Sequence, residues 1–216
     1  MPRFAFPVIP CAKEMDRTVV VHLHGYAPAS YTTTVLAPYE EHRHRITRDG
    51  VLLECTKRPK HCVAASLLWW LPRLARKWIA QADKILCVSK RQAEIISDLA
   101  PELRSKMEVV YNPISPELVN GEPNKDLDDV PTFLYVGGDS YVKGYHLLLR
   151  IIKELNERKV KARLVLTNKY DHESLKLLKG LSRKCENVRI DVLGRVAHGD
   201  VVRLHKVAWA LLFPSI

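Results

Sequence analysis

The chain contains the segment Phe133-Leu-Tyr-Val-Gly-Gly-Asp-Ser-Tyr-Val-Lys-Gly144, in which an apolar run, a glycine pair and a lysine follow one another. This order predicts a strand, a sharp turn and then a helix. Gly137 and Gly138 allow the backbone to turn and a ligand to come close, and helix N-terminal amides favour an anion. Lys143 adds a full positive charge. The segment therefore predicts a phosphate-binding loop formed by Gly137, Gly138, Lys143 and Gly144.

The spacing of this loop argues against two common nucleotide-binding motifs. It fits neither the G-x-x-x-x-G-K-[ST] loop nor the G-x-G-x-x-G fingerprint. A kinase-type NTPase or an NAD enzyme is therefore not the natural interpretation. The alternative is an ordinary strand-loop-helix junction with a solvated lysine, because a lone glycine loop is a weak signal.

The length and charge of the chain limit its class and its partners. Its 216 residues, 47% of them hydrophobic, suffice for one large domain or two small ones. The net charge of +10 is concentrated after residue 130, in the half that carries the glycine loop. Such an excess attracts a phosphate-rich ligand, an anionic membrane or nucleic acid. We expect no nucleic-acid partner, because the basic residues are not interleaved with aromatic residues that look exposed, and no RNA or DNA signature occurs.

The cysteines and histidines predict neither a disulfide framework nor a metal site. Five cysteines at irregular positions are typical of reduced thiols in a cytosol, and no signal-peptide layout or long apolar run indicates secretion or a membrane span. A metal site could combine Cys55, His61 and Cys62 with His42 or His44. The spacing is poor for zinc, because no C-x-x-C pair is present. We expect no metal.

Short runs rich in Val, Leu and Ile alternate with helical patterns along the chain. They predict strands at 18–23, 84–88, 108–111, 132–136, 163–167, 188–193 and 210–213. Continuous apolar strands between helices are typical of parallel sheets covered on both faces. Residues 116–131, with several prolines and acids, predict a linker. We expect an α/β fold with two domains, at 1–115 and 132–216.

Two helix starts carry recognisable caps. Ser89 with Gln92 forms a capping box, and Asp171 is expected to cap the helix that follows it. These patterns place helices after the strands at 84–88 and 163–167. They support the alternation of strands and helices.

Motifs outside the loop occur in the order of a known family. Val19-Val-Val-His-Leu-His-Gly25, Ala82-Asp-Lys-Ile-Leu-Cys-Val-Ser89, Val192-Leu-Gly-Arg-Val196 and the final Pro-Ser join the glycine loop in this order. Together they resemble retaining glycosyltransferases of family 4, the glycosyl transferases group 1, with two Rossmann-like domains of GT-B type. The resemblance implies transfer of a sugar from a nucleotide diphosphate sugar to a glycan or lipid-linked acceptor, without a metal or other cofactor.

The resemblance also assigns roles to individual residues. It implies that Gly137, Gly138, Lys143 and Gly144 hold the donor's diphosphate. Gly194 and Arg195 would lie near the nucleotide base. His24, at the carboxyl end of its strand, would contact the donor sugar and is the candidate catalytic residue. His22, two residues back on the same face, is expected to be deeper and structural.

The sequence departs from the family pattern in several places. The family has arginine where this chain has Gly138, and we expect either another base such as Arg195 to replace it or donor binding to weaken. A Glu-x7-Glu motif follows Pro-Ser in the family, but this sequence stops at Ile216. The opening strands of the first domain are also missing. These departures predict a fragment with two incomplete domains and slow sugar transfer.

Two other functions stay open. A nucleotide-sugar 2-epimerase shares the architecture, and acid and base carboxylates around the sugar would favour it. A non-catalytic basic module that binds a membrane or nucleic acid is the second alternative. The segment from Leu67 to Trp78 has Trp and Leu beside Arg73, Arg76 and Lys77, as in peripheral membrane helices. Packing in the core is the competing interpretation. The expected location is the cytoplasm, or peripherally at the inner membrane surface.

Overall fold

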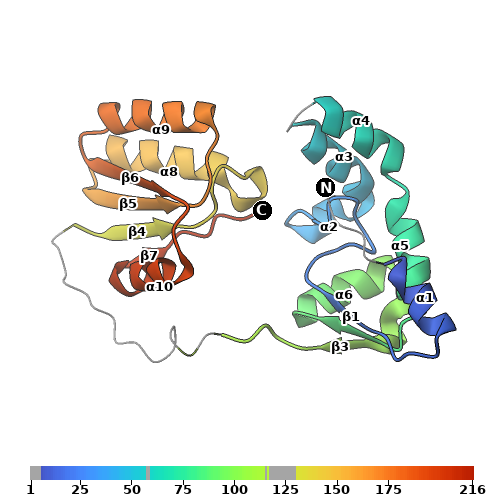
Figure 1. Ribbon diagram of the computed structural model, residues 1–216. Coiled ribbons are helices and arrows are strands. Elements are labelled where there is room, and N and C mark those ends of the chain that lie inside the picture. The colour runs from blue at the N-terminus through green and yellow to red at the C-terminus, as the bar shows by residue number, and fades with distance from the viewer. Residues whose placement is uncertain (1–5, 57–58, 115, 117–129) are drawn as a thin grey trace. The chain divides into compact units, whose positions relative to one another are not determined.

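The computed structural model describes residues 6–56, 59–114, 116 and 130–216, and the chain divides into two compact units between Pro113 and Ile114 (Figure 1). Most of the expected linker 116–131 lies outside the described residues. Each unit has its own parallel sheet with helices packed on it. The predicted α/β fold with two parallel sheets is therefore confirmed.

The first unit is built on a sheet in the order β1-β2-β3, with β1 at Val20–Leu23, β2 at Lys84–Cys87 and β3 at Met107–Val109. Its core consists of fully buried aliphatic side chains of the central strand and of the elements packed on it: Ile79, Ile85, Ile96 and Leu103. The helical elements are α1 (Val8–Glu14), α2 (Tyr39–His42), η1 (Arg43–Arg45), α3 (Ile46–Cys55), α4 (Pro59–Leu68), α5 (Leu71–Ile79), α6 (Lys90–Leu99) and η2 (Pro101–Lys106).

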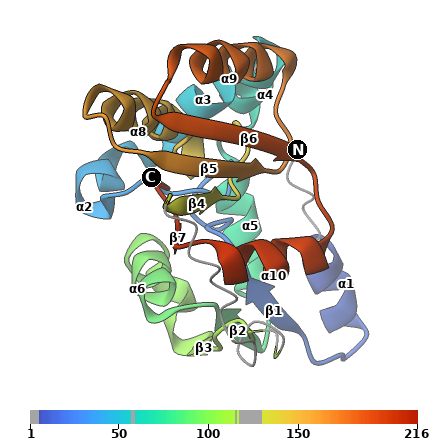
Figure 2. The ribbon, with the colours of Figure 1, turned by 90° about the vertical axis from the view of Figure 1, so that its left-hand side faces the viewer.

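The second unit has the strand order β6-β5-β4-β7, with β4 at Thr132–Tyr135, β5 at Ala162–Thr167, β6 at Val188–Gly194 and β7 at Ala210–Leu211. The short helix η3 (Tyr141–Lys143) leads into α8 (Tyr145–Glu157), and α9 (His172–Lys184) and α10 (His198–Val207) follow. Figures 1 and 2 show α8 and α9 on one side of the sheet and α10 on the other. The central strand β5 is buried almost throughout, as its unbroken apolar run predicted.

Both predicted caps are present. The Ser89 hydroxyl accepts a hydrogen bond from the Gln92 amide at 3.1 Å, and the Gln92 side chain accepts one from the Val88 amide at 2.8 Å. The Asp171 carboxylate accepts the Ser174 amide at 2.7 Å. These bonds satisfy amides that a helix start leaves unpaired, so both helices begin where the sequence indicated.

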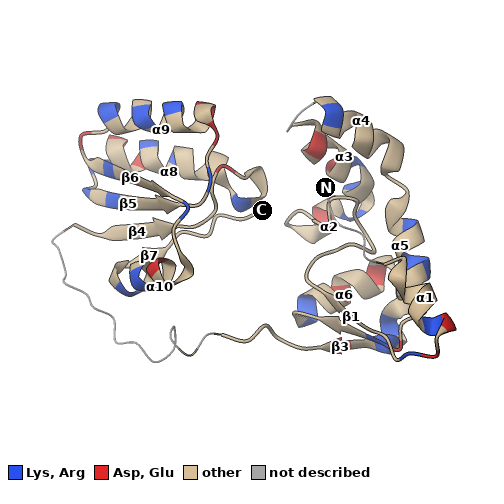
Figure 3. Cartoon of the chain, viewed as in Figure 1, with Lys and Arg blue, Asp and Glu red and all other residues tan. Residues whose placement is uncertain are grey.

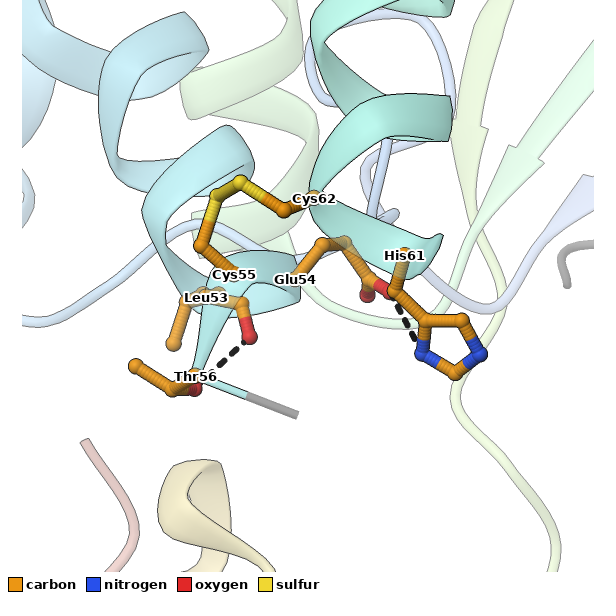
Figure 4. Close-up of a disulfide and its surroundings, with 6 residues drawn as sticks. All are labelled: Leu53, Glu54, Cys55, Thr56, His61 and Cys62. Carbon is orange, nitrogen blue, oxygen red and sulfur yellow. Dashed lines mark hydrogen bonds and ion pairs between the residues drawn. A yellow bond between two sulfur atoms is a disulfide. The ribbon is translucent and has the colours of Figure 1, made fainter. Parts of the chain in front are cut away.

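The expectation of reduced cysteines is wrong for Cys55 and Cys62, which form a disulfide (Figure 4). Cys55 ends α3 and Cys62 lies in the first turns of α4, and their Cα atoms are 4.0 Å apart. Sequence spacing gave no sign of the bond, because it depends on how the two helices turn back on one another. The bond also withdraws both sulfur atoms from the metal site considered above. Cys11, Cys87 and Cys185 are free thiols.

The segment at 64–81 is divided between two helices. It breaks at Trp69 and Trp70, with Pro72 in the first turn of α5, where a missing amide proton costs nothing. The α5 side chains Pro72, Ala75 and Ile79 are buried, so core packing is confirmed for α5. None of the helices in the described part of the chain is long and apolar enough to cross a membrane.

Candidate functional site

The glycine loop lies at the carboxyl edge of the second sheet, directly after β4. All four strands are parallel, so the segments that follow β4, β5, β6 and β7 gather at this edge. Open parallel sheets bind their ligands beyond the carboxyl ends of their strands. The fold thus puts the predicted loop where a ligand site is expected.

At two positions of the loop, the backbone conformation itself requires glycine. Gly138 and Gly144 have φ angles of 62° and 73°, in the left-handed region that disfavours side chains. A Cβ atom at Gly144 would also overlap the carbonyl oxygen of Pro214, because the segment after β7 runs against the start of α8. A hydrogen bond of 3.1 Å from the Ile216 amide to the Val142 carbonyl fixes that segment there.

The buried side chain of Tyr135 contacts the loop from the interior of the unit. Its hydroxyl lies 3.0 Å from the Gly138 carbonyl oxygen and 3.1 Å from that of Lys143. Burial raises the pKa of Tyr135 to about 12, so the hydroxyl keeps its proton as a donor. One side chain thereby holds both ends of the loop. Sequence reasoning missed this role, because a tyrosine at the end of an apolar strand resembles any core residue.

The amide groups of the loop divide into two sets. Those of Lys143, Gly144 and Tyr145 donate to the carbonyl oxygens of Ser140 and Tyr141, over 2.8–3.3 Å. Within the described residues, the amides of Gly137, Gly138 and Asp139 have no acceptor. An anion would therefore find backbone donors in the glycine turn.

Lys143 provides the positive charge of the loop. Its side chain is exposed, and its ammonium group lies 5.3 Å from the centre of the Phe213 ring, a cation–π contact. In the part of the chain that the structure describes, no carboxylate pairs with it. The charge is thus held near the loop without being neutralised.

Gly194 ends β6 and Arg195 follows it, at the same edge of the sheet. Gly194 has a φ angle of 70°, and its carbonyl oxygen accepts the Asn168 amide at 2.7 Å. The Arg195 side chain is exposed. Asn168 in turn donates to the Val136 carbonyl at 3.4 Å, so the segments after β4, β5 and β6 are joined. The segment after β5 carries no sequence motif, so the sequence did not indicate that it belongs to this site.

His24 belongs to the first unit. It follows β1, is exposed, and its ring centre lies 4.2 Å from that of His22. The expectation that His22 is deeper is wrong, because His22 is exposed as well. The physical reason is that β1 is an edge strand of the described sheet whose face at Val20 and His22 is not covered.

Comparison with known proteins identifies relatives of this chain. Residues 121–216 match the family described as glycosyl transferases group 1. No curated protein matches the chain significantly.

Several solved structures resemble the fold of this chain over almost its whole length. The crystal structure of Alr3699/HepE from Anabaena in complex with UDP and glucose has a TM-score of 0.62 at 17% identity, covering 98% of this chain and 50% of that one. Its complex with UDP-glucose has 0.61 at 16%, covering 96% and 50%. WaaG, a glycosyltransferase involved in lipopolysaccharide biosynthesis, has 0.52 at 18%, covering 96% and 56%. The chain therefore spans about half the length of these proteins and shares their fold.

Proposed function

Through residues 121–216 the chain belongs to the glycosyl transferases group 1 family, and from this membership we propose that it acts on a nucleotide diphosphate sugar as a glycosyltransferase. The observation that carries the proposal is the glycine loop, in which the amides of Gly137 and Gly138 and the charge of Lys143 have no partner among the described residues. Negative charge grows on the diphosphate as the bond to the sugar opens. Donors that are already oriented toward it stabilise this change most effectively.

The remaining assignments follow from the family resemblance and are proposals as well. The base would lie near Gly194 and Arg195, and the sugar would contact His24, with retention at the anomeric carbon. Because the Anabaena protein was crystallised with UDP-glucose, a UDP-hexose is the first donor to test. The acceptor is left open as a glycan or a lipid-linked molecule.

Calorimetric titration with UDP and with GDP tests the diphosphate site. We expect binding by the wild-type chain and a ten- to hundredfold loss in Lys143→Ala, since one charge-assisted contact contributes about 1.5–3 kcal/mol. Lys161→Ala is the matched control, because Lys161 is exposed and precedes β5, at the opposite edge of the sheet. Equal affinities of wild type and Lys143→Ala would favour the solvated-lysine alternative instead.

A survey of UDP- and GDP-sugars, with hydrolysis as the readout, tests catalysis itself. Release of the sugar with its anomeric configuration retained would support a retaining transferase. Conversion of the sugar to its 2-epimer would support the alternative enzyme class. His24→Ala should lower turnover more than nucleotide affinity, because its proposed contact is with the sugar.

A second proposal, contact with an anionic membrane, is favoured by the surface of α3 and α4. We define the α3–α4 patch as Leu52, Val63, Leu67, Trp69 and Trp70, whose side chains are 39–67% exposed. No acidic residue occurs between Glu54 and Asp83, and Figure 3 shows basic residues but no acidic ones on α4 and α5. Tryptophan and leucine beside cations suit the interface of an anionic bilayer.

The structure changes which residues of the predicted membrane segment can take part. The Arg76 guanidinium donates to the Pro28 carbonyl at 2.5 Å and is partly buried, so it serves the fold of the unit. Arg73 is exposed and lies over the Trp69 ring at 5.0 Å, beside the patch. The proposed membrane contact therefore rests on the α3–α4 patch and on Arg73 at the start of α5. We propose a peripheral location for the chain on this basis.

A further inference from the structure

A diphosphate carries more negative charge than one lysine can balance, and Lys143 is the single cation within the glycine loop itself. Within the second unit, a second cation would have to come from another segment at the same edge of the sheet. Two exposed candidates follow neighbouring strands, Lys169 after β5 and Arg195 after β6. Because β5 pairs directly with β4 and β6 does not, Lys169 is one strand spacing nearer to the loop, about 4.8 Å.

Backbone contacts fix the Lys169 segment against the loop. The Lys169 carbonyl oxygen would lie 2.7 Å from a Cβ atom placed on Gly138. The Asp171 amide donates to the Asp139 carboxylate at 2.6 Å. Together with the Asn168 bond to Val136, this gives two hydrogen bonds between residues 168–171 and 136–139, and the Lys169 carbonyl approaches Gly138 between them.

The same contacts explain why Gly138 itself carries no cation. Its φ angle of 62° and the approach of Lys169 both exclude a side chain there. A cation supplied by residue 138 is therefore incompatible with this packing. The group that occupies the space beside it is the backbone carbonyl oxygen of Lys169, whose own side chain is exposed.

The Lys169 charge is also available. Its side chain is exposed, and among the residues described no carboxylate pairs with its ammonium group. The nearest acids of the loops are engaged with amides: Asp139 accepts from Asp171, and Asp171 accepts from Ser174 at 2.7 Å. The hydrogen bond from the Ser174 amide also lowers the pKa of Asp171.

We propose that Lys169 is the second cation of the diphosphate site and binds phosphate oxygens together with Lys143. The inference rests on the proposed function and deepens it, because it assigns a binding residue that no motif indicates. Lys169 then supplies the positive charge for the phosphates that residue 138 cannot supply, because the backbone conformation at 138 excludes a side chain.

Titration of UDP, inorganic pyrophosphate and uridine against Lys169→Gln tests the inference. We expect UDP and pyrophosphate affinity to fall about tenfold, a loss of about 1.4 kcal/mol, while uridine binding stays unchanged. Lys169→Arg should retain most of the affinity, and Lys161→Gln should bind as wild type does. The slope of log affinity against log salt should become shallower in Lys169→Gln, because one ionic contact is removed. A melting curve checks that each variant is folded.

Three results would distinguish a failure of the Lys169 proposal from a failure of the diphosphate site. If Lys169→Gln binds UDP as wild type does while Lys143→Gln is weakened, Lys169 lies outside the site and the diphosphate site stands. If uridine binding falls as much as UDP binding, the effect is structural and the inference is wrong. If the wild-type chain binds neither UDP, GDP nor pyrophosphate, both proposals fail.

Discussion

The hydroxyl group of Tyr135 lies 3.0 Å from the carbonyl oxygen of Gly138, and it is the only side-chain donor to that oxygen within the described residues. The same hydroxyl can also reach Lys143. The hydroxyl has one proton, which the two carbonyl oxygens share. Removal of the hydroxyl therefore leaves both carbonyls without this donor. The shape of the loop thus depends on a residue that is itself almost fully buried.

Tyr135→Phe should therefore lower the free energy of unfolding of the second unit by about 1–2 kcal/mol and weaken UDP binding. Chemical denaturation and calorimetry measure the two effects. Tyr111→Phe is the control, because Tyr111 is 62% exposed. Unchanged UDP affinity in Tyr135→Phe would show that the loop keeps its shape without this hydroxyl.

Alkaline pH should destabilise the second unit. Burial raises the pKa of Tyr135 to about 12 and also raises the pKa of Tyr145 and Tyr170. In the unfolded chain these groups titrate near pH ~10, so their contribution is complete below that pH and is lost as the pH rises toward ~12. Denaturation series between pH ~9 and ~11 measure the slope. Tyr135→Phe should make it shallower, and an identical slope would contradict the assignment to Tyr135.

Two glycine substitutions should have opposite effects. Gly144→Ala meets Pro214 and a left-handed backbone, so it should cost about 2 kcal/mol or more of stability. Gly180→Ala lies within α9 with free space around the new methyl group, and it should add about 0.5–1 kcal/mol. Thermal or chemical unfolding of both variants provides the measurement. A stable Gly144→Ala would mean that the segment after β7 does not pack on the loop.

The disulfide between Cys55 and Cys62 should form in the purified chain. Three thiols, those of Cys11, Cys87 and Cys185, should react in the unfolded, unreduced protein, and five after reduction. Replacing both Cys55 and Cys62 with serine should cost about 2 kcal/mol in the chain-entropy account of a short loop, whereas Cys11→Ser should have little effect. Five reactive thiols without reductant would show that the pair stays reduced in the isolated protein.

The α3–α4 patch should bind anionic vesicles. Sedimentation with vesicles of phosphatidylglycerol and phosphatidylcholine should weaken at high salt, and in the variant that carries Leu67→Gln and Trp70→Gln. Val8→Gln serves as the control, because Val8 is 66% exposed on α1, away from the patch. Binding that resists both salt and substitution would remove the patch from the proposed membrane contact.

Local sequence patterns predicted the strands of both sheets, in their order, and two of the helix starts. The strands at 84–88 and 163–167 and the caps at Ser89 and Asp171 were predicted correctly, because apolar runs and capping pairs act over a few neighbouring residues. The glycine loop was recognisable for the same reason.

The tertiary structure alone decided which distant segments meet. Pro214 excludes a side chain at Gly144, and Lys169 excludes one at Gly138. Cys55 meets Cys62 because two helices turn back on each other. Likewise, Ala75 and Ile79 of α5 are buried while Leu67 of α4 is exposed, although all three side chains are apolar. Such contacts depend on the packing of whole elements across the sheet, and no local pattern of residues encodes them.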